Sequence, residues 1–167
     1  MEQYVLHVTH KCNFRCHYCY EKDRDTTYST EEIKATCSEI VKCKDQFRVE
    51  FIGGEPLLAF DHIKFAYAYI RSRVTLCQSF TISTNGALIS ESVIEWLRLH
   101  NDVDVSISLD GGRYANSLRV TNAGAGTYEL VLSNIKRLIQ EIGPDRTRVH
   151  ATATPYNVGL IAHSIDS

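Results

Sequence analysis

The chain has 167 residues, of which 44% are hydrophobic and 23% charged, and this composition is typical of a soluble globular protein. Its 18 Lys and Arg residues against 20 Asp and Glu residues leave no excess positive charge, so neither nucleic acid nor an anionic membrane is indicated as a partner. The N-terminus lacks the pattern of a signal peptide, and no apolar run approaches the ~20 residues of a transmembrane helix. We therefore expect one cytoplasmic domain that spans residues 1–167.

The first predicted element is a strand at Tyr4–Thr9, a run of β-branched and aromatic residues. The loop after it contains Cys12, Cys16 and Cys19, with Tyr18 just before the last thiol. Thiolates so closely spaced can converge on one centre only if a metal or cluster holds their charges together, and thiolate sulfur is the usual protein ligand of iron–sulfur clusters. A four-iron cluster fully held by protein needs four cysteines, so three would leave one iron open to another molecule.

The cysteine loop is also compatible with two simpler roles. The spacing suits one face of a helix, so the thiols could be core residues, although the stretch is polar for that. A structural zinc site could add His10 or His17 as a fourth ligand, although such sites usually pair two distant ligand dyads. The remaining cysteines, Cys37, Cys43 and Cys77, are scattered and do not resemble an auxiliary metal site. Without a secretion signal we expect no disulfides.

A capping box at Ser29 begins an amphipathic helix that carries Cys37 on its apolar stripe, where we expect it in the core. The next strand, Val49–Ile52, ends in the tetrapeptide Gly53–Pro56. Glycines at the end of a strand let the backbone come close to a ligand. A carboxylate such as that of Glu55, with carbonyl groups nearby, suits an ammonium group. A plain turn with an exposed glutamate is the alternative.

The second half of the chain continues the alternation of strands and helices. A helix at Phe60–Arg73 precedes a strand at Ser79–Ser83, which runs into the polar turn Thr84–Gly86. A further helical pattern begins at Ser90, so this turn connects a strand to a helix. Polar groups at the end of a strand can reach a ligand, and a mere turn is the alternative. The fourth strand, Val103–Ser108, follows.

Asp110 and two glycines close the fourth strand, and the alternative for this segment is a turn that needs positive φ at glycine. The clearest helix, Thr127–Ile142, has apolar residues at intervals of three and four and ends at a Gly-Pro pair. A fifth strand is predicted at Arg148–Thr154, and another apolar pattern begins within Asn157–Ser167. Alternating strands and helices predict right-handed βαβ units around a parallel sheet. Ligands collect at the carboxyl ends of the strands in such folds, and all four motif groups lie at that edge.

These motifs together resemble those of the radical S-adenosylmethionine (SAM) superfamily. The cysteine motif with Tyr18 comes first, the Gly-Gly-Glu-Pro segment and the polar turn follow in the order of that family, and the resemblance runs from Tyr4 to about Asn157. The fourth-strand segment SISLDG is similar to that of the peptide-modifying and anaerobic sulfatase-maturating (SPASM-type) members. The resemblance implies an α/β fold, a partial (β/α) barrel of about five parallel strands. Because the family's barrel normally has six strands, we expect a truncated core that lacks the C-terminal strand and any auxiliary-cluster domain.

The resemblance also implies the cofactors, a [4Fe–4S] cluster and S-adenosyl-L-methionine. The implied cluster ligands are Cys12, Cys16 and Cys19. The implied SAM contacts are Tyr18, Gly53, Gly54, Glu55, Ser83, Thr84, Asn85, Ser108, Asp110 and Arg119. By likeness, Glu55 holds the amino group of SAM, Arg119 its carboxylate, Tyr18 covers the adenine, and Ser108 and Asp110 point toward the ribose. Asn116 departs from the aspartate that relatives often carry, so no role is transferred to it.

The implied function is that of an enzyme which reductively cleaves SAM to a 5′-deoxyadenosyl radical and removes a hydrogen atom from its substrate. The SISLDG segment favours a peptide or protein side chain as substrate. A low-potential electron donor such as flavodoxin or ferredoxin is the implied partner. A glycyl-radical-enzyme activase, a zinc-binding interaction module and a non-catalytic relative that binds SAM are the alternatives.

Overall fold

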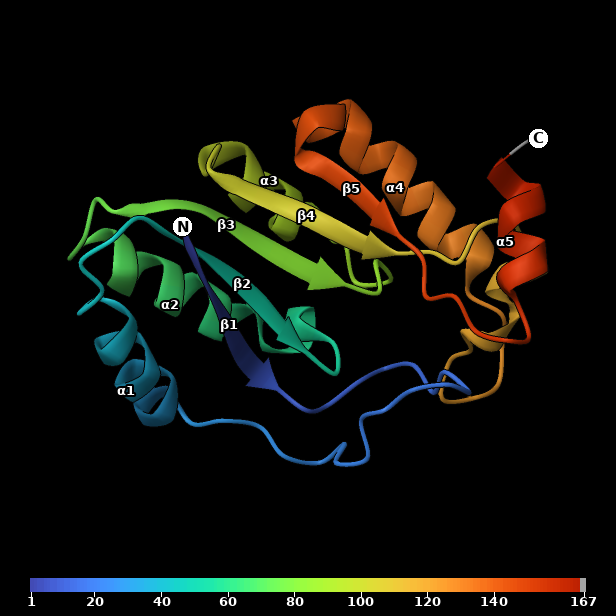
Figure 1. The fold of residues 1–167 in the computed structure, drawn as a ribbon, viewed down its shortest axis with the longest axis horizontal. Coiled ribbons are helices and arrows are strands. Elements are labelled where there is room, and N and C mark those ends of the chain that lie inside the picture. Colours follow the sequence, from blue (N-terminus) through green and yellow to red (C-terminus); the bar gives the residue numbers. More distant parts are fainter. Residues whose placement is uncertain (166–167) are drawn as a thin grey trace.

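The computed structural model describes residues 1–165, which form one sheet of five parallel strands with helices between them (Figure 1). The strands are β1 (Glu2–Thr9), β2 (Phe47–Gly53), β3 (Cys77–Thr84), β4 (Val103–Ser108) and β5 (Thr147–His150). Their order in the sheet is the same as in the chain, and every neighbouring pair is parallel. β1 and β5 are the two edges. The predicted partial (β/α) barrel is therefore confirmed.

Five α-helices alternate with the strands in the described part of the chain. They are α1 (Thr30–Ile40), α2 (Phe60–Arg71), α3 (Glu91–Leu99), α4 (Tyr128–Ile142) and α5 (Val158–Ile165), with short 3-10 helices at η1 (Pro56–Ala59), η2 (Ala115–Leu118) and η3 (Pro144–Arg146). The predicted capping box at Ser29 is present and begins α1. Within residues 1–165, no helix is both long and apolar enough to cross a membrane.

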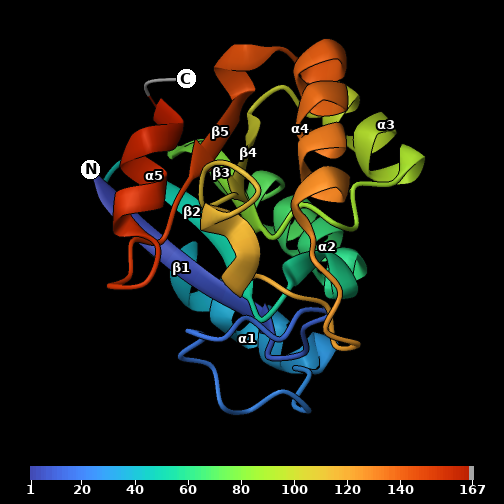
Figure 2. The ribbon, with the colours of Figure 1, turned by 90° about the vertical axis from the view of Figure 1, so that its right-hand side faces the viewer.

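One face of the sheet forms the hydrophobic core. Leu6, Phe51, Ile82 and Val105 are partners across four strands, and each is nearly fully buried. Side chains alternate between the faces of a strand, so these residues share one face, on which α1–α4 pack. Figure 2 shows α1–α4 curving around the outside of the sheet, with α5 apart from them. The opposite face is left for polar side chains such as that of Glu50.

The cysteines outside the motif have structural positions. All six cysteines of the chain are free. Cys37 is fully buried on α1, as predicted, and Cys77 is buried at the start of β3. Burial raises the pKa of each thiol to about 11, so both are uncharged core residues at neutral pH.

The fifth strand is shorter than predicted. We expected a strand at Arg148–Thr154, whereas β5 ends at His150. The backbone N–H of Thr152 donates to the Oδ1 atom of Asp110 (2.9 Å) instead of continuing the ladder, and Pro155 has no N–H to donate. The chain therefore turns away from the sheet towards α5. The last two residues of the predicted pattern at Asn157–Ser167 lie outside the described residues.

Candidate active site

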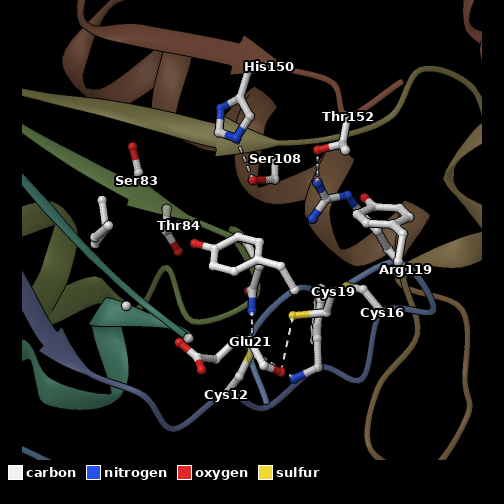
Figure 3. A pocket seen from close by; sticks show the side chains of 17 residues that line it. Cys12, Cys16, Cys19, Glu21, Ser83, Thr84, Ser108, Arg119, His150 and Thr152 are labelled. Atoms are coloured by element: carbon white, nitrogen blue, oxygen red, sulfur yellow. Dashed lines mark hydrogen bonds between the residues drawn. The ribbon is translucent and has the colours of Figure 1, made fainter. Parts of the chain in front are cut away.

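A pocket of about 310 Å³ opens at the carboxyl ends of the strands (Figure 3). Most of the predicted site residues line it: Cys12, Cys16, Tyr18, Cys19, Gly53, Gly54, Ser83, Thr84, Asn85, Ser108 and Arg119. Two predicted residues, Glu55 and Asp110, are not part of the lining. The lining also includes residues that the sequence did not single out, namely Phe14, Tyr20, Glu21, Ile52, His150 and Thr152.

The three motif cysteines face this one pocket. Cys12 and Cys16 are half-buried and Cys19 is exposed. Burial is the main cause that raises the pKa of the Cys12 and Cys16 thiols, while the Arg119 guanidinium opposes this rise at Cys16. Thiolates in such surroundings need a positive centre, because the charged form is otherwise disfavoured. An iron–sulfur cluster provides one.

A structural zinc ion needs four ligands that converge on one point. Within residues 1–165, no three His, Cys, Asp or Glu side chains lie close enough to share one metal ion. A four-iron cluster makes no such demand, because each cysteine binds a different iron. Both ring nitrogens of His10 already have partners, Glu21 at 2.8 Å and Tyr28 at 2.8 Å. His17 does not line the pocket, so neither histidine is placed as a fourth zinc ligand.

The cysteine loop is held on one side by the end of β2. The Gly54 N–H donates to the Thr9 carbonyl (2.9 Å), and the Glu55 N–H donates to the Lys11 carbonyl (2.8 Å). A Cβ atom on Gly53 would lie 2.2 Å from the Thr9 oxygen, and one on Gly54 would lie 2.3 Å from the His10 oxygen. Glycine is therefore required here for the approach of the chain's own backbone as well as for access to the pocket.

The same loop is held on its other side by the segment that runs from the end of η2 to α4. The Arg15 N–H donates to the Val120 carbonyl (2.8 Å), and the His17 N–H donates to the Leu118 carbonyl (2.9 Å). Phe14 forms an antiparallel bridge with Thr121. Figure 1 shows the blue loop running past the strand tips to meet this segment before α4. No local sequence pattern predicts this pairing, because it joins segments that lie far apart in the chain.

Glu55 is fully buried, and its carboxylate binds groups of the chain itself. Its Oε1 atom accepts hydrogen bonds from the Thr84 hydroxyl (2.6 Å) and the Leu57 N–H (3.0 Å), and its Oε2 atom accepts one from the Asn85 N–H (2.7 Å). Burial raises the pKa of this carboxyl, and the three hydrogen bonds oppose that rise. The carboxylate therefore joins the end of β2 to the turn after β3.

Asn85 continues this connection to the cysteine loop. Its Nδ2 atom donates to Asn13 Oδ1 (2.8 Å) and lies 3.9 Å from the Cys12 sulfur. The Phe14 N–H also donates to that sulfur, at 3.4 Å. The Gly-Gly-Glu segment, the polar turn and the first cysteine thus form one hydrogen-bonded unit, and the neutral donors stabilise a thiolate at Cys12.

Asp110 is also fully buried, and its carboxylate contacts residues of the chain itself. Tyr18 donates its hydroxyl to Asp110 Oδ2 (2.5 Å), and this bond and burial raise the Tyr18 pKa, with burial the larger cause. The Arg119 Nε atom lies 3.1 Å from Asp110 Oδ1. Asn116, to which the resemblance transferred no role, accepts a hydrogen bond from the Asp110 N–H (3.1 Å) and is buried beneath the site.

Arg119 faces the pocket from above the cysteine loop. Its guanidinium carbon lies 5.4 Å from the centre of the Tyr18 ring, within the range of a cation–π contact. Its Nη2 atom is 3.5 Å from the Thr152 hydroxyl. A dashed line in Figure 3 marks this contact. The contact with Tyr18 places that ring against a guanidinium, which the sequence did not predict.

His150 is the main pocket residue that was not predicted from the sequence. Its ring nitrogens lie 2.9 Å from the Ser106 hydroxyl and 2.7 Å from the Ser108 hydroxyl. Partial burial, and then the charge of Arg119, lower its pKa below the usual 6.5, so the ring is neutral at pH 7. The tendency of ligands to gather at the carboxyl ends of parallel strands could have identified it, because His150 ends β5.

The comparisons with known proteins agree with this geometry. The family model described as the radical SAM superfamily matches residues 6–155. The chain therefore belongs to the radical SAM superfamily, whose enzymes use a [4Fe–4S] cluster together with SAM.

Curated relatives share about a third of their aligned residues with this chain. An uncharacterised protein of Methanocaldococcus jannaschii is 32% identical over 123 residues, which are 71% of this chain and 42% of that protein. The radical SAM cyclopropyl synthase TigE of Paramaledivibacter caminithermalis is 28% identical over 152 residues, which are 80% of this chain and 32% of that protein. The chain thus spans less than half the length of these relatives.

Solved structures show the same fold. The protein anSMEcpe, an anaerobic sulfatase-maturating enzyme solved with AdoMet and the Cp18Cys peptide, has a TM-score of 0.72 at 22% identity and matches 89% of this chain and 42% of its own. Streptococcus suis SuiB, bound to the precursor peptide SuiA, has a TM-score of 0.66 at 18% identity. The match covers 96% of this chain and 35% of the SuiB chain. At these identities the likeness shows the shared fold.

Proposed function

We propose that this chain is the core domain of a radical SAM enzyme that binds a [4Fe–4S] cluster through Cys12, Cys16 and Cys19 and binds SAM beside it. One observation carries the proposal: the three thiols line the same pocket as the backbone of Gly53 and Gly54 and the guanidinium of Arg119. When bound, the cluster and SAM supply a 5′-deoxyadenosyl radical that removes a hydrogen atom from the substrate.

Different residues around the pocket bind different groups of SAM. Carbonyl groups at Gly53 and Gly54 accept hydrogen bonds from the amino group of SAM, in place of the buried Glu55 carboxylate. Arg119 binds the carboxylate of SAM, for which a planar guanidinium is well matched. The hydroxyl of Ser108, at the end of β4, binds the ribose.

We further propose that the substrate is a peptide or protein side chain and that the electron donor is a low-potential protein such as flavodoxin or ferredoxin. Two fold neighbours were solved with peptides, which supports a peptide substrate. Other curated relatives have different names, such as GTP 3′,8-cyclase from Clostridium acetobutylicum, so family membership alone does not select the substrate class. We place the reaction in the reducing cytoplasm, where free thiols persist.

Cleavage of SAM by the anaerobically reconstituted chain tests this proposal. With a strong reductant, wild-type protein should release 5′-deoxyadenosine, and Cys16→Ala should abolish the release because one iron loses its ligand. The matched control is Cys43→Ala, a free cysteine outside the pocket, which should leave the release unchanged. Equal release from Cys16→Ala and wild type would contradict the cluster assignment.

A further inference from the structure

Asp110 is a fully buried carboxylate that does not line the pocket, yet it contacts residues that do. The Tyr18 hydroxyl donates to its Oδ2 atom at 2.5 Å. The Nε atom of Arg119 and the backbone N–H of Thr152 approach its Oδ1 atom at 3.1 Å and 2.9 Å. Each carboxylate oxygen thus has a partner within the chain.

The charge of Asp110 needs a partner, because an unpaired charge inside a protein is strongly destabilising. Arg119, only 7% exposed, is the cation that the described residues place against it. The Nε–H of Arg119 is buried and makes no aligned hydrogen bond among the described residues, so the charge of Asp110 at 3.1 Å holds the guanidinium in place. One terminal nitrogen of the guanidinium, Nη2, is 3.5 Å from the hydroxyl of the pocket residue Thr152.

The same carboxylate joins three segments of the chain. Tyr18 belongs to the cysteine loop, Arg119 precedes α4, and Thr152 follows β5. The backbone bonds of the loop to Leu118 and Val120 surround this point, so Asp110 lies beneath the place where the cluster loop and the arginine meet. Movement at Asp110 would therefore change the position of Arg119 relative to the thiols.

We infer that Asp110 is a positioning residue for SAM: it holds Arg119 so that the terminal nitrogens of the guanidinium face the carboxylate of SAM, and it ties Tyr18 of the cysteine loop to that arginine. The inference rests on the proposed function, because it assumes that SAM occupies this pocket. It assigns to Asp110 an action through Arg119 rather than a contact with the ribose.

A double-mutant cycle on SAM binding tests this inference. Calorimetric titration of SAM into reconstituted protein should show affinity lowered about 10- to 100-fold by Asp110→Asn and by Arg119→Gln, the scale of one charge-assisted hydrogen bond. The double variant should bind no more weakly than Arg119→Gln, because both changes remove the same interaction. The control is Asp104→Asn, which changes a carboxylate on β4, the strand before Asp110, that pairs with Arg148 at 2.9 Å; this variant should bind SAM as wild type does.

The outcomes separate the inference from the proposed function. The inference alone is overturned if Asp110→Asn binds SAM with wild-type affinity. It is also overturned if the loss of affinity in the double variant is the product of the two single losses, as two independent effects would give. Wild-type protein that holds its cluster but does not bind SAM overturns both.

A second measurement needs no change at Asp110, in case that variant fails to fold. In ¹⁵N NMR spectra of the cluster-free wild-type chain, the Arg119 Nε–H, assigned with Arg119→Lys, should exchange slowly because it is buried beside Asp110. Exchange as fast as that of the exposed Arg148 side chain would overturn the inference.

Discussion

Glu55 shows how much a single carboxylate in this site contributes to stability. Glu55→Gln keeps the shape of the side chain but replaces one acceptor oxygen with a donor. In either orientation of the amide this donor faces a backbone N–H, that of Asn85 or of Leu57, which can only donate. We expect a loss of about 1–3 kcal/mol in the free energy of unfolding, the usual cost of an unsatisfied buried polar group. Urea unfolding of the cluster-free protein measures this loss.

The matched control for this change is Glu39→Gln, which alters an exposed carboxylate paired with Lys42. Exposed pairs contribute about 0–1 kcal/mol, so this variant should unfold almost as wild type does. Equal stability of the Glu55 and Glu39 variants would show that the three hydrogen bonds to Glu55 carry no stabilising effect.

His150 gives the site a dependence on pH. Partial burial and the nearby Arg119 lower its pKa below 6.5, while Glu50 and Asp110 oppose this shift. As the pH falls, the ring takes up a proton near pH 6.5 in the unfolded chain, whereas in the folded protein it does so only at a lower pH. Stability is therefore full above pH 6.5 and is lost as the pH falls through the lower pKa of the folded state.

The variant His150→Gln removes this titration and keeps a polar side chain between the two serines. We expect wild type to lose more stability than the variant between about pH 7.5 and pH 5.5, measured by urea unfolding of both proteins at each pH. If the difference in stability between the two proteins is the same at both pH values, His150 does not have the lowered pKa.

At the scale of elements, the end of β2 supports the cysteine loop only because Gly54 has no side chain. Gly54→Ala would place a Cβ atom 2.3 Å from the His10 oxygen and 2.6 Å from the Lys11 oxygen, both of them backbone atoms that cannot turn aside. We expect the loop to shift and the iron content after reconstitution to fall well below that of wild type.

The control for this variant is Gly126→Ala, since a Cβ atom there meets nothing within 4 Å. It should take up iron as wild type does. Wild-type iron content in Gly54→Ala would mean that the loop reaches its cluster geometry without this backbone contact. Iron analysis of both variants, prepared together, distinguishes these results.

Across the whole molecule, the sequence predicted the order and type of the elements because strands and helices leave different hydrophobic periods. It also predicted the edge at which the site lies, because parallel strands carry their ligands at their carboxyl ends. It could not predict that Glu55 and Asp110 are buried, since a carboxylate can bind a ligand as readily as it accepts hydrogen bonds from groups of the same chain. The pairing of the cysteine loop with the segment before α4 was equally inaccessible, because it depends on tertiary contacts alone.

The proposed function depends on an iron–sulfur cluster with one iron open to SAM. The most direct test is electron paramagnetic resonance of the reduced, reconstituted protein before and after addition of SAM labelled with ¹⁵N at its amino group. We predict the signal of a reduced [4Fe–4S] cluster that changes when SAM is added and acquires a coupling to the ¹⁵N nucleus. A cluster signal that is identical with and without SAM, or the absence of any cluster signal, would contradict this assignment.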